Sequence, residues 1–133
     1  MSAGLEVQKA IFDTLSASVP LSAIVSGVFD DVPVNYDSFP YVTIGEDLLT
    51  QWDTDKKTGF SVSVTIHTWS RVKGQVQVKT VQGLIYNALH NAVFSFTGYD
   101  SVLCQERTGE SFKDPDGLTR HGVQVYNILI QKQ

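Results

Sequence analysis

The chain has 133 residues, of which 42% are apolar and 18% are charged. This length and balance predict one globular domain with a single core, spanning residues 1–133, and exclude a disordered chain. No apolar run exceeds three residues, which excludes a transmembrane helix. The net charge of −4 disfavours a protein that grips nucleic acid phosphates. The single Cys104 excludes an internal disulfide, and residues 1–6 lack the pattern of a secretory signal.

Two helices are expected in the first part of the chain. Apolar residues recur every four positions at Val7, Ile11 and Leu15, which is typical of an amphipathic helix over residues 4–16. Its polar positions are expected to face water; they are Glu6, Gln8, Lys9 and Asp13. Pro20 suits the first turn of a second, short helix, and Gly27 suits its end.

Residues 29–36 are rich in Asp, Pro and Asn, and they predict a connector that leads to a strand starting at Pro40. Residues 60–69 alternate between an apolar and a mostly polar face, which is typical of a strand with one side on the core. The charged residues 53–59 separate these two strands. We therefore expect an antiparallel pair with a solvated tip.

The main helix is expected over residues 74–93, where apolar residues follow a period of 3.6. Gly83 inside it suggests close packing against another backbone. Strands are predicted over residues 101–107 and 120–130, joined by a polar segment with the turn sequence Asp-Pro-Asp-Gly. In the last strand the apolar set shifts from odd to even positions, which a bulge near Val125 or burial of both faces explains.

The expected order of elements is α-α-β-β-α-β-β. Such a chain stacks its helices on one face of a mostly antiparallel sheet, which is an α+β sandwich of two layers.

Catalytic and cofactor chemistry finds little support. His67, His90 and His121 lie in different predicted elements without the short spacing of metal ligands, so we expect no metal site. Cys104 lies in the middle of a strand and is expected to be a small buried hydrophobe. No glycine-rich phosphate loop and no nucleophile elbow is present, so we expect no cofactor and no enzyme activity.

Several aromatic residues fall outside the regular apolar faces. Trp69 lies on the mostly polar side of its strand, and Trp52 and Phe112 lie in or beside predicted loops. Such positions suggest contact with a partner. For Phe94 and Phe96, covering one end of the core is an equally good explanation.

Three segments, read in order, resemble one family. They are Phe39–Glu46, the strand end Ile66–Arg71 with Gly74 opening a helix, and Asp114–Val123. The first helix and Val32-Pro33 also fall where the family has similar residues. The family is that of the tail completion or tail terminator proteins of long-tailed bacteriophages and of related phage-like gene transfer particles. The resemblance covers nearly the whole chain, and it depends on the order and spacing of the segments.

The resemblance implies a structural role without catalysis. Family members look like small α+β domains that form a six-membered ring on the last ring of the tail tube. There they stop tube growth and offer a surface to the head-side connector. The expected partners are copies of the chain itself, the tail tube protein and the connector. DNA is expected to pass through the ring without specific binding, and the expected location is the neck of the virion after assembly in the host cytoplasm.

Two sets of residues are expected to serve this assembly. The candidates for contact with other subunits or the tube are Trp52, Trp69, His67, Arg71, Phe112 and Arg120. Acidic residues that line a DNA-conducting lumen repel the passing duplex. The candidates for this lining are Asp53, Asp55, Glu110, Asp114 and Asp116.

Two other functions remain open at this stage. The first is a different neck or minor tail component with the same fold, which only its position in the particle distinguishes. The second is a small enzyme or ligand-binding domain with a pocket between helices and sheet. Its only candidate groups are His67, Cys104 and His121, and nothing in the sequence links them.

Overall fold

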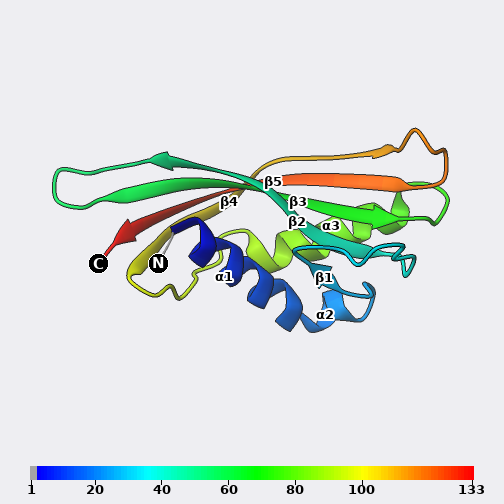
Figure 1. Ribbon diagram of the computed structural model, residues 1–133, viewed down its shortest axis with the longest axis horizontal. Helices are drawn as coiled ribbons and strands as arrows, with labels where there is room; N and C mark the ends of the chain where they lie inside the picture. The colour runs from blue at the N-terminus through cyan, green and yellow to red at the C-terminus, as the bar shows by residue number, and fades with distance from the viewer. Residues whose placement is uncertain (1–2) are drawn as a thin grey trace.

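A five-stranded sheet with helices on one side forms the body of the molecule, as the computed structural model of residues 3–133 shows (Figure 1). The strands lie in the order β1-β2-β3-β5-β4. All neighbouring strands are antiparallel except β1 and β2. In chain order the elements are α1 (Ala3–Ala17), α2 (Val19–Ser22), β1 (Val28–Phe29), β2 (Tyr41–Gln51), β3 (Gly59–Ser70), α3 (Val76–Leu89), β4 (Tyr99–Lys113) and β5 (Arg120–Lys132).

The predicted α+β sandwich is confirmed, with one additional strand. The expected connector begins with β1, which pairs in parallel with β2 through Val28 and Val42. The Val42 amide donates to the Gly27 carbonyl at 3.1 Å, and the Ser26 amide donates to the Pro40 carbonyl at 2.8 Å. These bonds tie the segment after α2 to the sheet. No helix among residues 3–133 has the length and apolar character that crossing a membrane requires.

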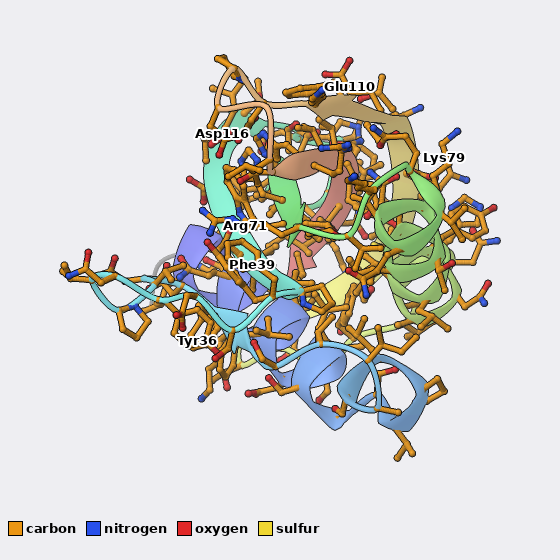
Figure 2. The ribbon with its side chains drawn as sticks, turned by 90° about the vertical axis from the view of Figure 1, so that its right-hand side faces the viewer. Tyr36, Phe39, Arg71, Lys79, Glu110 and Asp116 are labelled. Atoms are coloured by element: carbon orange, nitrogen blue, oxygen red, sulfur yellow. The ribbon has the colours of Figure 1, made fainter. Side chains whose placement is uncertain are left out.

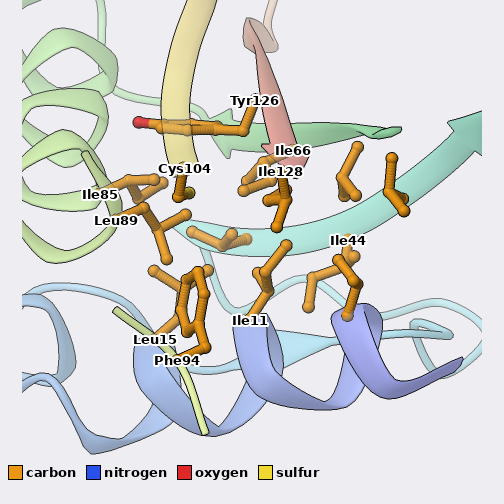
Figure 3. Close-up of a cluster of buried hydrophobic side chains, with 14 of the residues drawn as sticks. Ile11, Leu15, Ile44, Ile66, Ile85, Leu89, Phe94, Cys104, Tyr126 and Ile128 are labelled. Carbon is orange, nitrogen blue, oxygen red and sulfur yellow. The ribbon is translucent and has the colours of Figure 1, made fainter. Parts of the chain in front are cut away.

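Helix α1 packs its apolar stripe on the β1–β2–β3 half of the sheet. Ile11 and Leu15 are fully buried, and Figure 3 shows them in the same cluster of side chains as Ile44 and Ile66. Burial of one such side chain contributes about 1.5–3 kcal/mol. The expected stripe is therefore confirmed.

The expectation that Glu6 faces water is wrong. Only 5% of its surface is exposed, and its Oε1 accepts a hydrogen bond from the Thr97 amide at 3.0 Å. The segment after α3 folds back over the start of α1 and covers this carboxylate. Because the bond joins residues that are far apart in sequence, helical periodicity alone did not predict it.

Helix α3 covers the β3–β5–β4 half of the sheet. It begins two residues later than predicted and ends at Leu89, after which Asn91 adopts a positive φ of 61°. Phe94 and Phe96 then turn inward and are each 9% exposed. They cover one end of the core, which decides between the two explanations left open for them.

The close packing expected at Gly83 is absent. A Cβ atom added there would meet nothing within 4 Å, because this position of α3 faces an open groove. The groove lies between α3 and the edge strand β4.

The apolar shift expected in the last strand has a different cause. The side chains at even positions of Gly122–Ile130 are buried without interruption, while Val123 and Val125 lie half-buried on the other face. The irregularity is in the neighbouring strand, where the pairing slips between Glu106 and Thr108, opposite Val125. Strand β5 is regular, and the edge strand β4 carries both irregularities of this pair.

Two hairpins project from opposite ends of the sheet (Figure 1). One is the predicted antiparallel pair β2–β3, whose solvated tip is confirmed. The other is β4–β5, and here β4 continues to Lys113 instead of ending near residue 107. Glu110 and Phe112 therefore lie on a strand and not in a loop.

Candidate assembly surfaces

The sheet face opposite the helices carries a continuous row of rings, which we call the aromatic band. Every strand contributes at least one ring to it. The centroids of neighbouring rings lie 3.8–6.4 Å apart. The members of the band are Phe29, Tyr36, Phe39, Tyr41, His67, Trp69, Phe112 and His121.

Trp69 lies at the centre of the band because the β3–β5 register places it directly opposite His121. The two rings stack at 3.8 Å between centroids and 14° between planes. The indole Nε1 of Trp69 donates to Thr43 Oγ1 on β2 at 3.2 Å. Trp69 is thus half-buried, with one face held by β5 and its polar edge held by β2.

The two histidines of the band hydrogen-bond to each other. His67 Nδ1 and His121 Nε2 are 2.7 Å apart, so one nitrogen donates and the other accepts. At the outer ends of the pair, His67 Nε2 lies 3.0 Å from Glu46 Oε1, and His121 Nδ1 lies 3.6 Å from Asp114 Oδ1. The four side chains form a line across the sheet, from Glu46 on β2 to Asp114 at the β4–β5 tip.

This line shifts the ionisation of two of its groups. The hydrogen bond from His67 holds the pKa of Glu46 below its ordinary value of 4.5. Burial and, next, the neighbouring His67 lower the pKa of His121 below 6.5, although Asp114 opposes the shift. Near neutral pH Glu46 is therefore a carboxylate and His121 is neutral, and acidification adds charge to a packed surface.

Arg71 lies at the end of the band that Phe39 forms. Its guanidinium lies 4.5 Å from the centre of the Phe39 ring, and its Nε donates to Thr119 Oγ1 at 3.3 Å. Figure 2 shows Arg71 directly above Phe39, with Asp116 beyond it. Arg71 thereby links the β4–β5 tip to the segment that precedes β2.

The structure brings together four of the six expected contact residues, since Trp69, His67, Arg71 and Phe112 all border the band. Trp52 lies apart from them at the base of the β2–β3 tip, where its amide donates to the Gly59 carbonyl at 2.8 Å. Arg120 lies opposite Ser70 and donates to the Leu118 carbonyl at 3.1 Å.

Sequence reasoning did not place His121 and Tyr41 on this surface. Both are at odd positions, as Trp69 is, and alternation predicts one common side within each strand. What was missing is the register between β5, β3 and β2, which places His121 and Tyr41 on either side of Trp69.

The five acidic candidates form two separate groups. Asp53 and Asp55 lie at the β2–β3 tip, whereas Glu110, Asp114 and Asp116 lie at the β4–β5 tip at the other end of the molecule (Figure 1). One subunit therefore offers acidic side chains at both ends instead of a single acidic patch.

Two of these acidic side chains also stabilise the turns in which they lie. Asp53 Oδ1 accepts hydrogen bonds from Gln51 Nε2 at 2.8 Å and from the Gly59 amide at 3.2 Å. Asp116 accepts bonds from the amides of Leu118 and Thr119, each at 2.8 Å, and from Thr119 Oγ1 at 2.7 Å. These bonds lower the pKa of Asp116 to about 2, so its charge persists into acid.

The geometry does not assemble the nucleophile and base that the enzyme alternative needs. Cys104 is fully buried on the helix side of the sheet, and burial raises the pKa of its thiol to about 12. His67 and His121 lie on the opposite side. Residues 3–133 hold no group of three or more His, Cys, Asp or Glu side chains that could bind a metal ion.

Comparison with known proteins decides the family. The family described as tail completion protein gp17 matches residues 9–131. The tail completion protein gp17 of Bacillus phage SPP1 is 31% identical over 121 residues, which covers 88% of this chain and 86% of that protein. This chain belongs to the tail completion protein family. It is a structural component of a phage or phage-like particle and not an enzyme.

Two solved structures share the fold. A chain in the virion of a native gene transfer agent particle superposes with a TM-score of 0.89 at 19% identity, covering 98% of this chain and 99% of that chain. The structure of bacteriophage SPP1 gp17 gives a TM-score of 0.64 at 23% identity, covering 95% and 89%. The α+β sandwich is thus the family's fold, and the resemblance inferred from the sequence is confirmed.

Proposed function

We propose that this tail completion protein forms a ring, of six copies, on the last ring of the tail tube. The ring stops tube growth and offers its other side to the head-side connector. The observation that carries this proposal is the projection of two long hairpins from opposite ends of one sheet (Figure 1). One hairpin can contact the tube while the other contacts the connector.

The lateral sides of the molecule also suit a ring. A cyclic assembly needs two different surfaces on each subunit, because every contact is head to tail. Here α1 lies under the β1–β2 side of the sheet and α3 lies under the β4 side, so the two flanks differ in sequence and shape. The sheet itself is open, with β1 at one edge and β4 at the other.

The aromatic band supplies a third contact surface. Phe112 is 40% exposed at the β4 end of the band, beside the half-buried Trp69 and His121. Half-buried aromatic rings can bury a large area when a partner binds. The cost in side-chain entropy is small, because few rotamers are lost. We assign the band to contact with the tube or with the connector.

The charge of the ring fits passage of DNA without specific binding. Six copies, each with a net charge of −4, give a ring of roughly −24. Acidic side chains at both hairpin tips place part of this charge at the two ends of each subunit. A lumen bordered by carboxylates repels the duplex and lets it slide.

Measuring tail length in particles that lack this protein tests the proposal. We expect tails of uncontrolled length without heads, because nothing then stops tube growth or joins the connector. Adding the purified chain to isolated tubes should give a cap with the mass of six copies. Tails of normal length that still lack heads would instead identify another neck component. A chain that neither forms rings nor binds tubes would overturn the proposal.

A further inference from the structure

Two histidines of the aromatic band meet across the pairing of β3 and β5. The register places His121 opposite Trp69 and one diagonal step from His67. The planes of the two imidazole rings differ by 30°, and His67 Nδ1 lies 2.7 Å from His121 Nε2. The side chains of His67 and His121 are only 16% and 13% exposed, so little water reaches the bond between them. This bond therefore depends on a hydrogen from one of the two rings.

A carboxylate lies beyond each end of this histidine pair. Glu46 Oε1 on β2 lies 3.0 Å from His67 Nε2, whereas Asp114 Oδ1 at the β4–β5 tip lies 3.6 Å from His121 Nδ1. The first distance is that of a hydrogen bond, and the second is longer than one. The line of four side chains thus has three contacts, of which two are hydrogen bonds.

The number of hydrogens on the two rings accounts for this difference. Three hydrogen bonds need a hydrogen on three of the four ring nitrogens, namely on both outer nitrogens and on one of the two central ones. Two neutral imidazoles carry only two. When these serve Glu46 and the central bond, the Nδ1 lone pair of His121 faces the Asp114 carboxylate. One added proton completes the line, and the pair then carries one positive charge between two carboxylates.

A second proton has the opposite effect on the pair. When both rings are charged, each central nitrogen carries a hydrogen and neither can accept one. Two N–H groups cannot stay 2.7 Å apart, so the rings must separate. The pKa of His121 lies below 6.5 because of its burial first and the neighbouring His67 next. This direction is the one expected if the pair binds its second proton less readily than its first.

The charged groups around the pair favour the first added proton. Glu46 faces the pair from β2 and Asp114 faces it from the β4–β5 tip, and both oppose the lowering of the His121 pKa. From β4, the uncharged ring of Phe112 packs against His121 at 5.0 Å between centroids. The Arg71 guanidinium lies over another ring of the band and is not among the groups that shift the His121 pKa.

Strand β2 leaves room for the ring of His67. A Cβ atom on Gly45 would lie 2.7 Å from the His67 ring, so glycine lets this ring lie directly against the strand. The pairing of β2 with β3 slips in register just here, and Glu46 follows at the outer nitrogen. Because His67 is held between β2 and its partner ring, breaking the central bond should displace His121.

A displacement of His121 affects both the band and the tip. Its ring stacks on Trp69 at 3.8 Å between centroids, at the centre of the band. Its Nδ1 faces Asp114, whose amide donates to the Thr119 carbonyl at 2.8 Å and closes the β4–β5 turn. Moving the ring uncovers Trp69 and separates the turn from the histidine pair.

We propose that His67 and His121 form a two-step proton switch in the aromatic band. The first added proton completes the line from Glu46 to Asp114 and holds the band and the β4–β5 turn together. The second proton breaks the bond between the rings, and His121 then leaves Trp69. Because the band is the surface that we assign to the tube or the connector, acid weakens that contact at the second step. Only this last consequence rests on the proposed function, since the switch is a property of the single chain.

Nuclear magnetic resonance of the imidazole nitrogens in the purified chain tests the switch between pH 8 and 4. We expect His67 and His121 to titrate together in two steps about one pH unit or more apart, because the shared hydrogen couples the rings. The indole Nε1–H resonance of Trp69 should move with the second step, and that of Trp52, at the β2–β3 tip, should not. Two rings that titrate independently, each in a single step, would overturn the switch. A Trp69 resonance that ignores the second step would do the same.

Asp114→Asn tests the count of hydrogens. The asparagine amide can donate to the Nδ1 lone pair of His121, so the neutral line is already complete. We expect the first proton to bind about tenfold more weakly, which is a shift of about one pH unit. The matched control Asp55→Asn makes the same change of charge at the exposed β2–β3 tip and should leave both steps in place. An unshifted first step in Asp114→Asn, or an equal shift in the control, would contradict the proposal.

His67→Phe tests the coupling between the rings. The variant keeps a ring beside Trp69 but removes the partner of His121, so we expect His121 to titrate in one step. That step should lie at a higher pH than the second step of the wild-type chain, because the neighbouring charge is gone. Two steps that persist in this variant would overturn the pairing.

The consequence for assembly has a separate test. Tubes capped by the wild-type chain should lose their caps as the pH falls through the second step. Caps that stay bound there, while the chain still titrates in two steps, would overturn the assignment of the band to this contact and leave the switch intact.

Discussion

The two faces of the sheet carry the same alternating strands but are built from different side chains. The helix side of β3 holds Val62, Val64 and Ile66, which are at most 2% exposed. The opposite side holds His67 and Trp69, which remain half-buried and are joined by stacking and hydrogen bonds. The first face stabilises the fold through area removed from water. The second is ordered in the monomer and remains partly exposed, so it is available for the contact that we propose.

Removing a side chain from the helix side should have the largest effect on stability. Ile66→Ala leaves a cavity between β3 and α1, and we expect a loss of about 2–5 kcal/mol. Urea unfolding followed by circular dichroism measures this. Thr65→Ala, on the other face of the same strand, is the matched control and should cost far less. Equal losses for the two variants would show that the faces do not differ.

Truncating the centre of the band should act mainly on assembly. Trp69→Ala removes the ring stacked on His121, and we expect a loss of about 1–2 kcal/mol in the monomer, together with failure to cap tubes. Thermal unfolding measures the first effect and electron microscopy of tails the second. A stability loss as large as that of Ile66→Ala, with normal capping, would make Trp69 an ordinary core residue.

A substitution at Gly83, beside the groove between α3 and β4, should raise the stability of the fold instead of lowering it. Gly83→Ala adds a methyl group in open space within α3, and we expect the free energy of unfolding to rise by about 0.5–1 kcal/mol. Thermal unfolding measures the gain. Gly59→Ala is the contrasting control, because its Cβ would lie 2.3 Å from the Trp52 carbonyl oxygen and should destabilise the hairpin. Destabilisation by Gly83→Ala would mean that the helix is packed more tightly there.

Acidification should weaken the band before it affects the core. The pKa of His121 is lower in the folded chain than its ordinary 6.5, so the unfolded chain binds the proton more tightly. The stability is therefore fully present above pH 6.5 and declines as the pH falls below it. Glu46, with its pKa lowered from 4.5, adds a second decline below that pH. Unfolding in urea between pH 3 and 8 checks both steps.

His121→Phe separates the two steps. The variant keeps a ring against Trp69 and removes the titrating group, so we expect the decline just below pH 6.5 to shrink and the one due to Glu46 to remain. An unchanged profile between pH 5 and 7 would show that another group is responsible.

Much of the fold could be predicted from the sequence because the signals are local. The spacing of Val7, Ile11 and Leu15 predicted α1, and the alternation over residues 60–69 predicted β3 with its buried face. The family resemblance depended on the order of such segments and was confirmed by comparison. Errors fell where a distant segment intervened, as at Glu6, which Thr97 covers.

The candidate surfaces could be predicted only in part. Periodicity assigned Trp69 and His67 to one side of β3, but it could not show that His121 would stack on that side or that Arg71 would reach Phe39. Nor could it show that Gly83 faces a groove, since the space depends on where β4 lies relative to α3.

By itself the sequence determined α1, α3 and β3 with the buried side of each, because the period of apolar residues is a property of consecutive positions. Only the tertiary structure decided the register that builds the aromatic band, the burial of Glu6, and the placement of the two hairpin tips at opposite ends. These features join residues that are far apart along the chain. Their geometry follows from packing and strand pairing, which no local pattern encodes.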